Sequence, residues 1–341
     1  ASSTTSESDA ACSGRAMNVA TYSNGAVSDG MGNLNSAKMG PAVLIAGPTA
    51  SGKSALALEL ARRHGGVVVN ADSMQVYREL RILSARPDME EEAQAPHRLY
   101  GHVAASERYS VARWREDAKE ALEAAWRDGA LPIVVGGTGL YFKALTEGLS
   151  SIPPIPAELR AAIEARADAE GVPALHAALG QLDPESAERL APLDRTRVTR
   201  ALEVVEATGR SIGEWQRETG SPPLVEESSV RRIVLEPERA ILYERIGRRF
   251  DLMVERGGMA EAEALLALNL NPALPAMKAI GIREFGAHLA GELSLDEAIE
   301  RAKMETRRYA KRQGTWFRNQ MADWERHAPS AAPPEISWRS A

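Results

Sequence analysis

The sequence predicts an α/β fold, in which a parallel sheet core is interrupted by an all-helical insertion domain. Short apolar segments of strand length, such as Ala42–Ala46 and Val67–Asn70, alternate with amphipathic segments of helix length before residue 150. This alternation is typical of βαβ units and a parallel sheet. Residues 157–217 are instead rich in Ala, Leu, Glu and Arg and contain no strand-like segment.

The first apolar segment runs into Gly-Pro-Thr-Ala-Ser-Gly-Lys-Ser, which matches the G-x-x-x-x-G-K-[ST] phosphate loop. The apolar spacing after it predicts the helix that this motif requires. Loop N–H groups and Lys53 are suited to a phosphate anion, and the Ser54 hydroxyl to Mg²⁺. We therefore expect a P-loop NTPase-like core that binds a di- or triphosphate through Gly47, Pro48, Thr49, Ala50, Ser51, Gly52, Lys53 and Ser54.

Asp72 follows the second predicted strand. Ligands of open parallel sheets bind outside the carboxyl ends of the strands, so Asp72 is expected beside the phosphate loop. Aspartate also caps helices well, and the residues alone leave both roles open.

The third predicted strand, Leu131–Val135, is followed by Gly136, Gly137 and Thr138. Many phosphate-loop ATPases and GTPases carry an acidic residue here that holds the magnesium ion. A Gly-Gly-Thr turn can hold a phosphate group through backbone donors and one hydroxyl, but it offers no such acid. The sequence therefore argues against nucleotide hydrolysis.

The chain divides into five predicted parts. Residues 1–40 are a disordered leader, because they are rich in Ser, Ala, Gly and Asn without apolar periodicity. Residues 41–149 and 231–326 form the core, the second part beginning with a strand at Arg231–Leu235. Residues 150–230 form the helical insertion, and 327–341 a flexible tail.

Composition narrows the function further. The net charge of −6 over 341 residues argues against a surface that is basic throughout. The predicted helix from Leu295 to Trp324 is nevertheless locally basic, with Arg301, Lys303, Arg307, Arg308, Lys311, Arg312 and Arg318.

Three features favour a cytoplasmic location: the single cysteine, Cys12, the lack of a secretory signal and the lack of an apolar run of membrane length. His97 and His102 lack a third ligand at metal spacing and are expected in loops.

Six motifs in the same order resemble those of bacterial-type tRNA dimethylallyltransferases, also called tRNA isopentenyltransferases, of the IPP transferase family. The resemblance spans Ala42 to about Arg326. The motifs are the phosphate loop, Asp-Ser-Met-Gln-Val-Tyr at 72–77, Pro-His-Arg-Leu at 96–99, Gly-Gly-Thr-Gly-Leu-Tyr at 136–141, Ala-Ile-Gly-Ile-Arg at 279–283 and Thr-Arg-Arg-Tyr-Ala-Lys-Arg-Gln-Gly-Thr-Trp-Phe-Arg at 306–318.

This resemblance implies a reaction. A dimethylallyl group would pass from dimethylallyl diphosphate to N6 of adenosine 37, next to the anticodon of tRNAs that read codons beginning with U. The products would be N6-(dimethylallyl)adenosine and diphosphate. By the same resemblance Asp72 is the general base, Thr138 and Arg249 stabilise the diphosphate, and Mg²⁺ at Ser54 bridges it.

The resemblance also implies binding of the tRNA anticodon stem-loop, and we expect the protein to be a monomer. On the residues alone, Arg195, Arg197 and Arg200 would form a solvated helix face paired with Glu203 and Glu206; the resemblance instead makes 150–230 a tRNA-binding domain. Thr196 and Lys278 depart from some relatives. The implied tRNA-binding residues are Asp72, Ser73, Met74, Gln75, Thr138, Arg160, Thr196, Arg197, Val198, Thr199, Arg200, Lys278, Ala279, Ile280, Gly281, Ile282 and Arg283.

Three other functions compete with this interpretation. An adenylate (cytokinin-type) isopentenyltransferase would share Asp72 and the phosphate loop, but it should lack the full insertion and the basic helix. A small-molecule phosphate-loop kinase is a second enzyme alternative. A non-catalytic P-loop RNA-binding protein would have no need of a carboxylate beside a diphosphate site.

Overall fold

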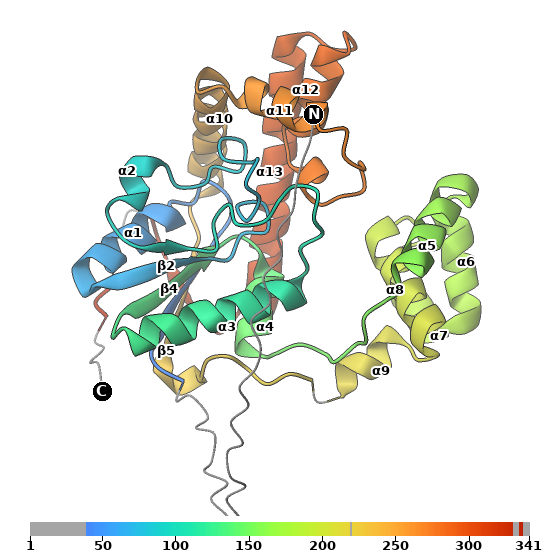
Figure 1. Cartoon of the computed structure of the whole chain (residues 1–341), viewed down its shortest axis with the longest axis horizontal. Helices are drawn as coiled ribbons and strands as arrows, with labels where there is room; N and C mark the ends of the chain where they lie inside the picture. The colour runs from blue at the N-terminus through green and yellow to red at the C-terminus, as the bar shows by residue number, and fades with distance from the viewer. Residues whose placement is uncertain (1–38, 219, 330–333, 337–341) are drawn as a thin grey trace, which may run out of the picture. The chain divides into compact units, whose positions relative to one another are not determined.

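A six-stranded parallel sheet forms the centre of the protein (Figure 1). The computed structural model describes residues 39–218, 220–329 and 334–336; most of the predicted leader, residues 1–38, and much of the predicted tail lie outside these residues. The strand order is β3-β2-β4-β1-β5-β6. The strands are β1 (Ala42–Ala46), β2 (Gly66–Asn70), β3 (His97–Arg98), β4 (Leu131–Gly136), β5 (Val230–Leu235) and β6 (Glu325–His327).

Helices and loops connect the strands. The α-helices are α1 (Lys53–His64), α2 (Met89–Glu92), α3 (Val111–Arg127), α4 (Gly139–Thr146), α5 (Ala157–Glu170), α6 (Val172–Leu182), α7 (Pro184–Arg189), α8 (Arg195–Thr208), α9 (Ile212–Arg217), α10 (Arg239–Glu255), α11 (Gly258–Ala267), α12 (Ile282–Leu289) and α13 (Leu295–Gln320). Short 3₁₀ turns occur at Glu227–Ser229 and Ala276–Lys278. Within the described residues, no helix combines the length and the apolar character needed to cross a membrane.

Both faces of the sheet are buried, which explains why its strands read as continuous apolar runs. Because side chains alternate along a strand, Leu44 of β1 packs into the core cluster on one face and Ile45 into the cluster on the other. Helix α1 covers the second face through Leu56 and Leu60. Helices α3, α4 and α13 contribute to the core on the first face, where Phe317 is one of the largest fully buried side chains.

Two short edge strands were not predicted. The chain leaves α13 at Gln320, before the predicted end at Trp324, and forms β6 beside β5. Trp324 is buried against Phe142, and Arg326 donates to the carbonyl oxygen of Met321 at the helix end. Because these contacts turn the chain back to the sheet, the helix does not continue beyond Gln320. The prediction of a loop at His97 was also wrong, since this residue lies in β3.

Helices α5 to α9 lie together between α4 and β5 in the chain and share a core of their own (Figure 1). This core contains Ile163, Leu175, Val198 and Leu202. The two connecting segments pair through an antiparallel bridge between Leu149 and Ser221. The helices predicted over 157–208 are present, and their ends lie within one or two residues of the predicted ends. The predicted boundaries of the insertion domain, at residues 150 and 230, stay predictions.

Two glycines provide a test of the packing at the sheet. A Cβ atom at Gly136, the last residue of β4, would overlap the backbone of Ala71, whereas a Cβ atom at Gly247 in α10 would meet nothing within 4 Å. We expect Gly136→Ala to lower the free energy of unfolding by about 1–3 kcal/mol through overpacking. Gly247→Ala should raise it by roughly 0.5–1 kcal/mol, because alanine favours the helix. Denaturant unfolding measures both, and a Gly136→Ala protein as stable as the parent would contradict the packing described.

Candidate active site

The phosphate loop lies between β1 and α1, as the sequence predicts. Ala50 and Gly52 have φ values of 62° and 95°, and left-handed residues of this kind occur in backbone nests that bind anions. Helix α1 begins at Lys53 and has no acidic residue in its first turn. The positive end of the helix is therefore available to an anion on the loop.

Lys53 is buried, and its Nζ donates to the carbonyl oxygen of Pro48 at 3.3 Å. Burial lowers the pKa of Lys53 to about 8; Asp72 acts in the opposite direction, and Arg249 lowers the pKa further. Lys53, Asp72 and Arg249 thus form one electrostatic cluster. A bound dianion would restore the full charge of Lys53, because a nearby negative charge favours the protonated amine.

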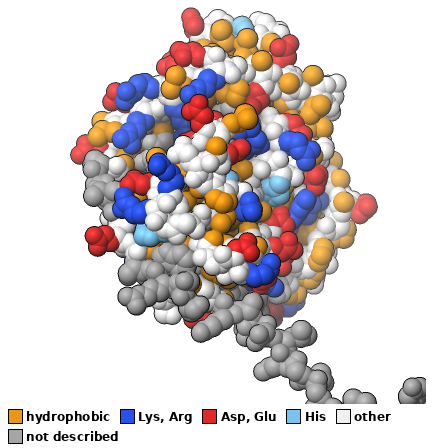
Figure 2. All heavy atoms as spheres, turned by 60° about the vertical axis from the view of Figure 1, so that its left-hand side comes forward, with side chains coloured by type: hydrophobic (Ala, Val, Ile, Leu, Met, Phe, Trp, Pro, Cys, Tyr) orange, Lys and Arg blue, Asp and Glu red, His pale blue; other side chains and the backbone are white. Residues whose placement is uncertain are grey.

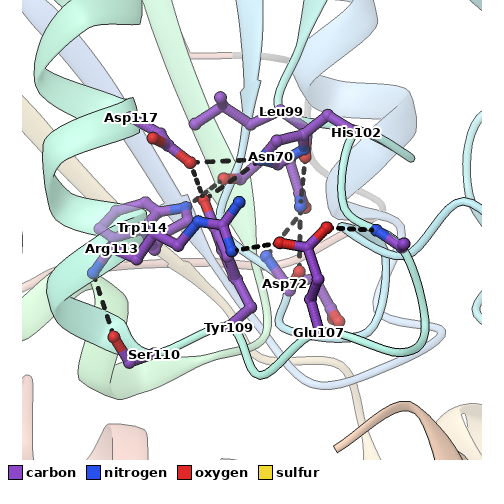
Figure 3. Close-up of polar contacts among 11 residues, drawn as sticks. Asn70, Asp72, Leu99, His102, Glu107, Tyr109, Ser110, Arg113, Trp114 and Asp117 are labelled. Carbon is purple, nitrogen blue, oxygen red and sulfur yellow. Dashed lines mark hydrogen bonds and ion pairs between the residues drawn. The ribbon is translucent and has the colours of Figure 1, made fainter.

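Asp72 is fixed by an exchange of hydrogen bonds with Asn70 at the end of β2 (Figure 3). The Asp72 N–H donates to Asn70 Oδ1 at 2.8 Å, and Asn70 Nδ2 donates to the Asp72 carbonyl oxygen at 2.9 Å. Asp72 Oδ1 accepts the N–H of Met74 at 2.9 Å. Among the described residues, Oδ2 accepts no hydrogen bond and is left to take a proton. The capping role considered for Asp72 does not apply, since no helix begins at this residue.

The turn after β4 joins this arrangement. The Thr138 N–H donates to the carbonyl oxygen of Ala71 at 3.1 Å, and Thr138 Oγ1 accepts the N–H of Ser73 at 2.9 Å. A Cβ atom at Gly137 would lie 3.3 Å from Asp72 Oδ2 and would overlap the side chain of Gln313. The Gly-Gly-Thr turn therefore lies directly against the carboxylate, and a larger residue at position 137 would not fit.

Gln313 of α13 connects the phosphate loop to the turn after β4, a role that the sequence analysis did not assign. Its Oε1 accepts the N–H of Thr49 at 2.9 Å, and its Nε2 donates to the carbonyl oxygen of Gly137 at 2.8 Å. The side chain is buried. A glutamine on the apolar face of a long amphipathic helix was the available signal, because a buried amide needs partners from elsewhere in the fold.

A cavity of about 480 Å³ adjoins the phosphate loop. Its lining includes Ser54 and two carboxylates, Asp88 and Glu91. Burial lowers the pKa of Arg249, while Asp72 and Glu91 raise it; guanidinium keeps its charge in proteins nevertheless. The cavity thus has an excess of positive charge suited to a diphosphate. The cations that line it are Lys53, Arg249 and three that the sequence analysis missed, Arg81, Arg86 and Arg256.

A smaller recess of about 50 Å³, which we call the apolar recess because most of its lining residues are apolar, also contacts Arg249. It shares Ala50, Ala85 and Met253 with the charged cavity. Leu83, Ile246, Phe250 and Ile280 complete its apolar lining. The arrangement places an apolar space beside a charged one, as a donor with an apolar group on a diphosphate requires.

Gln75, one of the implied tRNA-binding residues, makes its side-chain contacts inside the protein. It is buried, and its Nε2 donates to the carbonyl oxygens of Ser84 and Ala85 at 3.0 and 2.9 Å. These bonds occupy the amide donors with backbone, so only Oε1 is free to contact a base. Ser73 and Met74, the neighbours that share the prediction, are half-buried.

Only some of the predicted tRNA-binding residues of the insertion have exposed side chains. Thr196 and Arg197 are exposed on α8, whereas Val198 and Thr199 face the core of the insertion and their side chains are unavailable to RNA. Thr199 Oγ1 donates to the carbonyl oxygen of Arg195 instead.

Arg160 and Arg200 lie on either side of Glu203, whose side chain is only 8% exposed. Their ion pairs with Glu203 measure 3.6 and 3.2 Å. The glutamate therefore holds two predicted RNA contacts close together. The pairing of Arg200 with Glu203, expected from the residues alone, is present, whereas Glu206 pairs with Arg166 of α5.

The segment from Lys278 to Arg283, which is predicted to contact RNA, also contains both exposed and buried residues. Lys278 and Arg283 are exposed, while Ala279, Gly281 and Ile282 are buried. Ile280 lines the apolar recess. Side-chain contact with RNA is thus possible at the two charged ends, and the residues between them belong to the core and to the recess.

Charge on the outside of the molecule is mixed. Figure 2 shows lysine and arginine side chains interspersed with acidic ones over the face drawn. On α13, Lys303 pairs with Asp251 at 2.7 Å and Arg308 with Glu305 at 2.6 Å. The predicted basic helix is therefore partly neutralised by its neighbours.

A polar network surrounds Tyr109 next to the Asp72 turn (Figure 3). The Tyr109 hydroxyl donates to Asp117 Oδ2 at 2.6 Å, and His102 Nε2 lies 3.2 Å from the same hydroxyl. The indole of Trp114 donates to the carbonyl oxygen of Asn70 at 2.8 Å. Among the described residues, no group of three or more His, Cys, Asp or Glu side chains could hold a metal ion. The network supports the turn structurally.

Comparisons with known proteins agree with this arrangement. The IPP transferase family model matches residues 75–320, and the isopentenyl transferase model matches residues 41–108. A tRNA dimethylallyltransferase from Nitrobacter hamburgensis is 55% identical over 296 residues, which cover 87% of this chain and 93% of that protein. One from Chelativorans sp. is 58% identical over 289 residues, with 84% and 98% covered.

Solved structures are similar too. A tRNA isopentenylpyrophosphate transferase from Bacillus halodurans has a TM-score of 0.61 and 38% identity, covering 85% of this chain and 90% of its own. A eukaryotic dimethylallyltransferase acting on tRNA has a TM-score of 0.71 and 29% identity, covering 85% of this chain and 74% of its own. On the matched family model, the relatives and the shared fold, the chain belongs to the IPP transferase family.

Proposed function

We propose that the protein transfers a dimethylallyl group from dimethylallyl diphosphate to N6 of adenosine 37 in tRNA, giving N6-(dimethylallyl)adenosine and diphosphate. The relatives described above are named for this activity. The observation that carries the proposal is the position of the Asp72 carboxylate, which lies in one electrostatic cluster with Lys53 and Arg249 at the phosphate loop. A base and a site for a diphosphate leaving group are thus adjacent.

The charged cavity and the recess are suited to the two halves of the donor. The diphosphate would lie on the loop amides, where Lys53, Thr138 and Arg249 stabilise the charge that builds on the leaving oxygen. The dimethylallyl group would point to the apolar side. As the carbon–oxygen bond to the diphosphate breaks and the bond from N6 to the same carbon forms, Asp72 takes the proton from N6.

The adenine must leave the anticodon loop to reach this carboxylate, because recognition of RNA bases generally requires splayed, unstacked nucleotides. The exposed arginines of α8, with Thr196, Lys278 and Arg283, are the candidates to hold the anticodon stem-loop. The proposal includes the donor, dimethylallyl diphosphate, and a preference for tRNAs that read codons beginning with U. One chain supplies the phosphate loop, Asp72, Thr138 and Arg249, which supports a monomer, and a tRNA substrate supports a cytoplasmic location.

The donor set also fits Mg²⁺. The ion prefers oxygen ligands and commonly binds through one or two protein groups together with substrate phosphates. Ser54, Asp88 and Glu91 line the same cavity. We propose that Ser54 holds the ion, which would neutralise charge on the diphosphate when bound.

Asp72→Asn tests the proposed function directly. The amide keeps the size of the side chain but cannot accept the N6 proton, so transfer to unmodified tRNA should fall by about 10²–10⁴-fold. Binding of tRNA should change little, and Asp128→Asn, which alters an exposed carboxylate at the end of α3, is the control. Single-turnover transfer and a tRNA binding assay measure the two effects. Unchanged transfer in Asp72→Asn would contradict the assignment of the base.

The lowered pKa of Lys53 predicts a pH dependence. Protonated Lys53 binds the diphosphate, and its pKa of about 8 means that the donor-free enzyme loses this charge as the pH rises above that value. The value of kcat/KM for the donor should therefore fall on the alkaline side, since this parameter reports ionisations of the free enzyme. Lys53→Met should have a low kcat/KM that does not fall in this way as the pH rises. If kcat/KM of Lys53→Met fell with the same midpoint, another group would be responsible for the pH dependence.

A further inference from the structure

The loop of residues 81–86 is held to the fold by a residue about 180 positions further along the chain. Glu261 of α11 accepts the N–H groups of Arg81 and Ile82 on Oε2, at 2.8 and 2.7 Å, and the N–H of Leu83 on Oε1 at 2.8 Å. Three successive amides thus converge on one carboxylate. Charge-assisted bonds of this kind are roughly twice as strong as neutral ones.

A carboxylate is the side-chain group that suits this position. Both of its oxygens accept, and the three N–H groups supply only donors. A glutamine of the same length would present one accepting oxygen and an NH₂ group that faces a backbone donor. At least one loop amide would then lose its partner, and the loop would lose the anion that holds its turned conformation.

The far end of the loop is held from the active site. Ala85 has a left-handed φ of 52°, a conformation that persists in a non-glycine residue only when its surroundings enforce it. Its carbonyl oxygen accepts from Gln75 Nε2 at 2.9 Å and from Arg249 Nη2 at 3.4 Å. The loop is therefore held between Glu261 on one side and two residues of the site on the other.

The same loop forms a wall of both donor spaces. Ile82, Ala85 and Arg86 line the charged cavity, and Leu83 and Ser84 line the apolar recess. Glu261 lines neither space, so any effect on a ligand there must pass through the loop.

We propose that Glu261 is a positioning residue for the donor: its carboxylate fixes the loop 81–86 so that the Ala85 carbonyl holds Arg249 at the diphosphate. This inference rests on the proposed function for the identity of the donor. The placement of a diphosphate in the cavity can be tested without any transfer reaction.

The test compares Glu261→Gln with Glu263→Gln in the full chain. Glu263 is on the same helix, exposed, and accepts no hydrogen bond from the loop, so the two variants make the same chemical change. Titration calorimetry with inorganic pyrophosphate and Mg²⁺ should show roughly 10- to 100-fold weaker binding in Glu261→Gln, the scale expected when a supporting group is misplaced. Glu263→Gln should bind like the parent. Equal affinities in all three proteins would overturn the proposal.

Two further readouts separate positioning from a general loss of structure. Affinity for tRNA should stay close to that of the parent, and loss of tRNA affinity together with pyrophosphate affinity would reject a specific role. Arg249→Met and Glu261→Gln should also be non-additive toward pyrophosphate, because Glu261 acts through Arg249; additive effects would place Glu261 outside this path. If the parent transfers nothing to tRNA yet the pyrophosphate results hold, the proposed function fails and the role of Glu261 stands.

Discussion

The adjacency of β1, β2 and β4 in the parallel sheet is the constraint on which the proposed chemistry depends. The carboxyl ends of these strands carry the phosphate loop, Asp72 and Thr138, and parallel pairing puts all three at one edge. Gln313 then joins the first and third of these loops through two hydrogen bonds. In the proposed function, this edge holds the diphosphate of the donor and the proton acceptor together.

Much of this arrangement could be predicted from the sequence, because it depends on local patterns. The phosphate loop has a fixed spacing and a strand and helix around it, so its conformation follows from neighbouring residues. Asp72 and Thr138 follow apolar strands, and the rule for parallel sheets then places them beside the loop. The helices of the insertion also follow from periodicity, and α8 begins at Arg195, one residue after the predicted start at Asp194. In each case the information lies within a few residues of the feature.

The features that were missed depend on contacts between distant parts of the chain. Gln313 lies 264 residues from Thr49, and Glu261 lies 180 from Arg81, so no local spacing connects the partners. The edge strand β6 forms because Trp324 and Arg326 make tertiary contacts, against the helical tendency of the preceding residues. The burial of Val198 and Thr199 was not predicted either, because a contiguous motif does not distinguish the inner from the outer face of a helix.

The most direct test of the account is to locate the product in the RNA. The parent protein is incubated with an unmodified anticodon stem-loop, adenosine monophosphate and dimethylallyl diphosphate labelled in the dimethylallyl group. The RNA is then digested, and the digest and the free nucleotide are both analysed by mass spectrometry. The account predicts the label on N6 of adenosine 37, with release of one diphosphate for each group transferred. Release of diphosphate without labelled RNA would indicate hydrolysis, and a label on free adenine nucleotides but not on the stem-loop would indicate a different acceptor; either result would contradict the account.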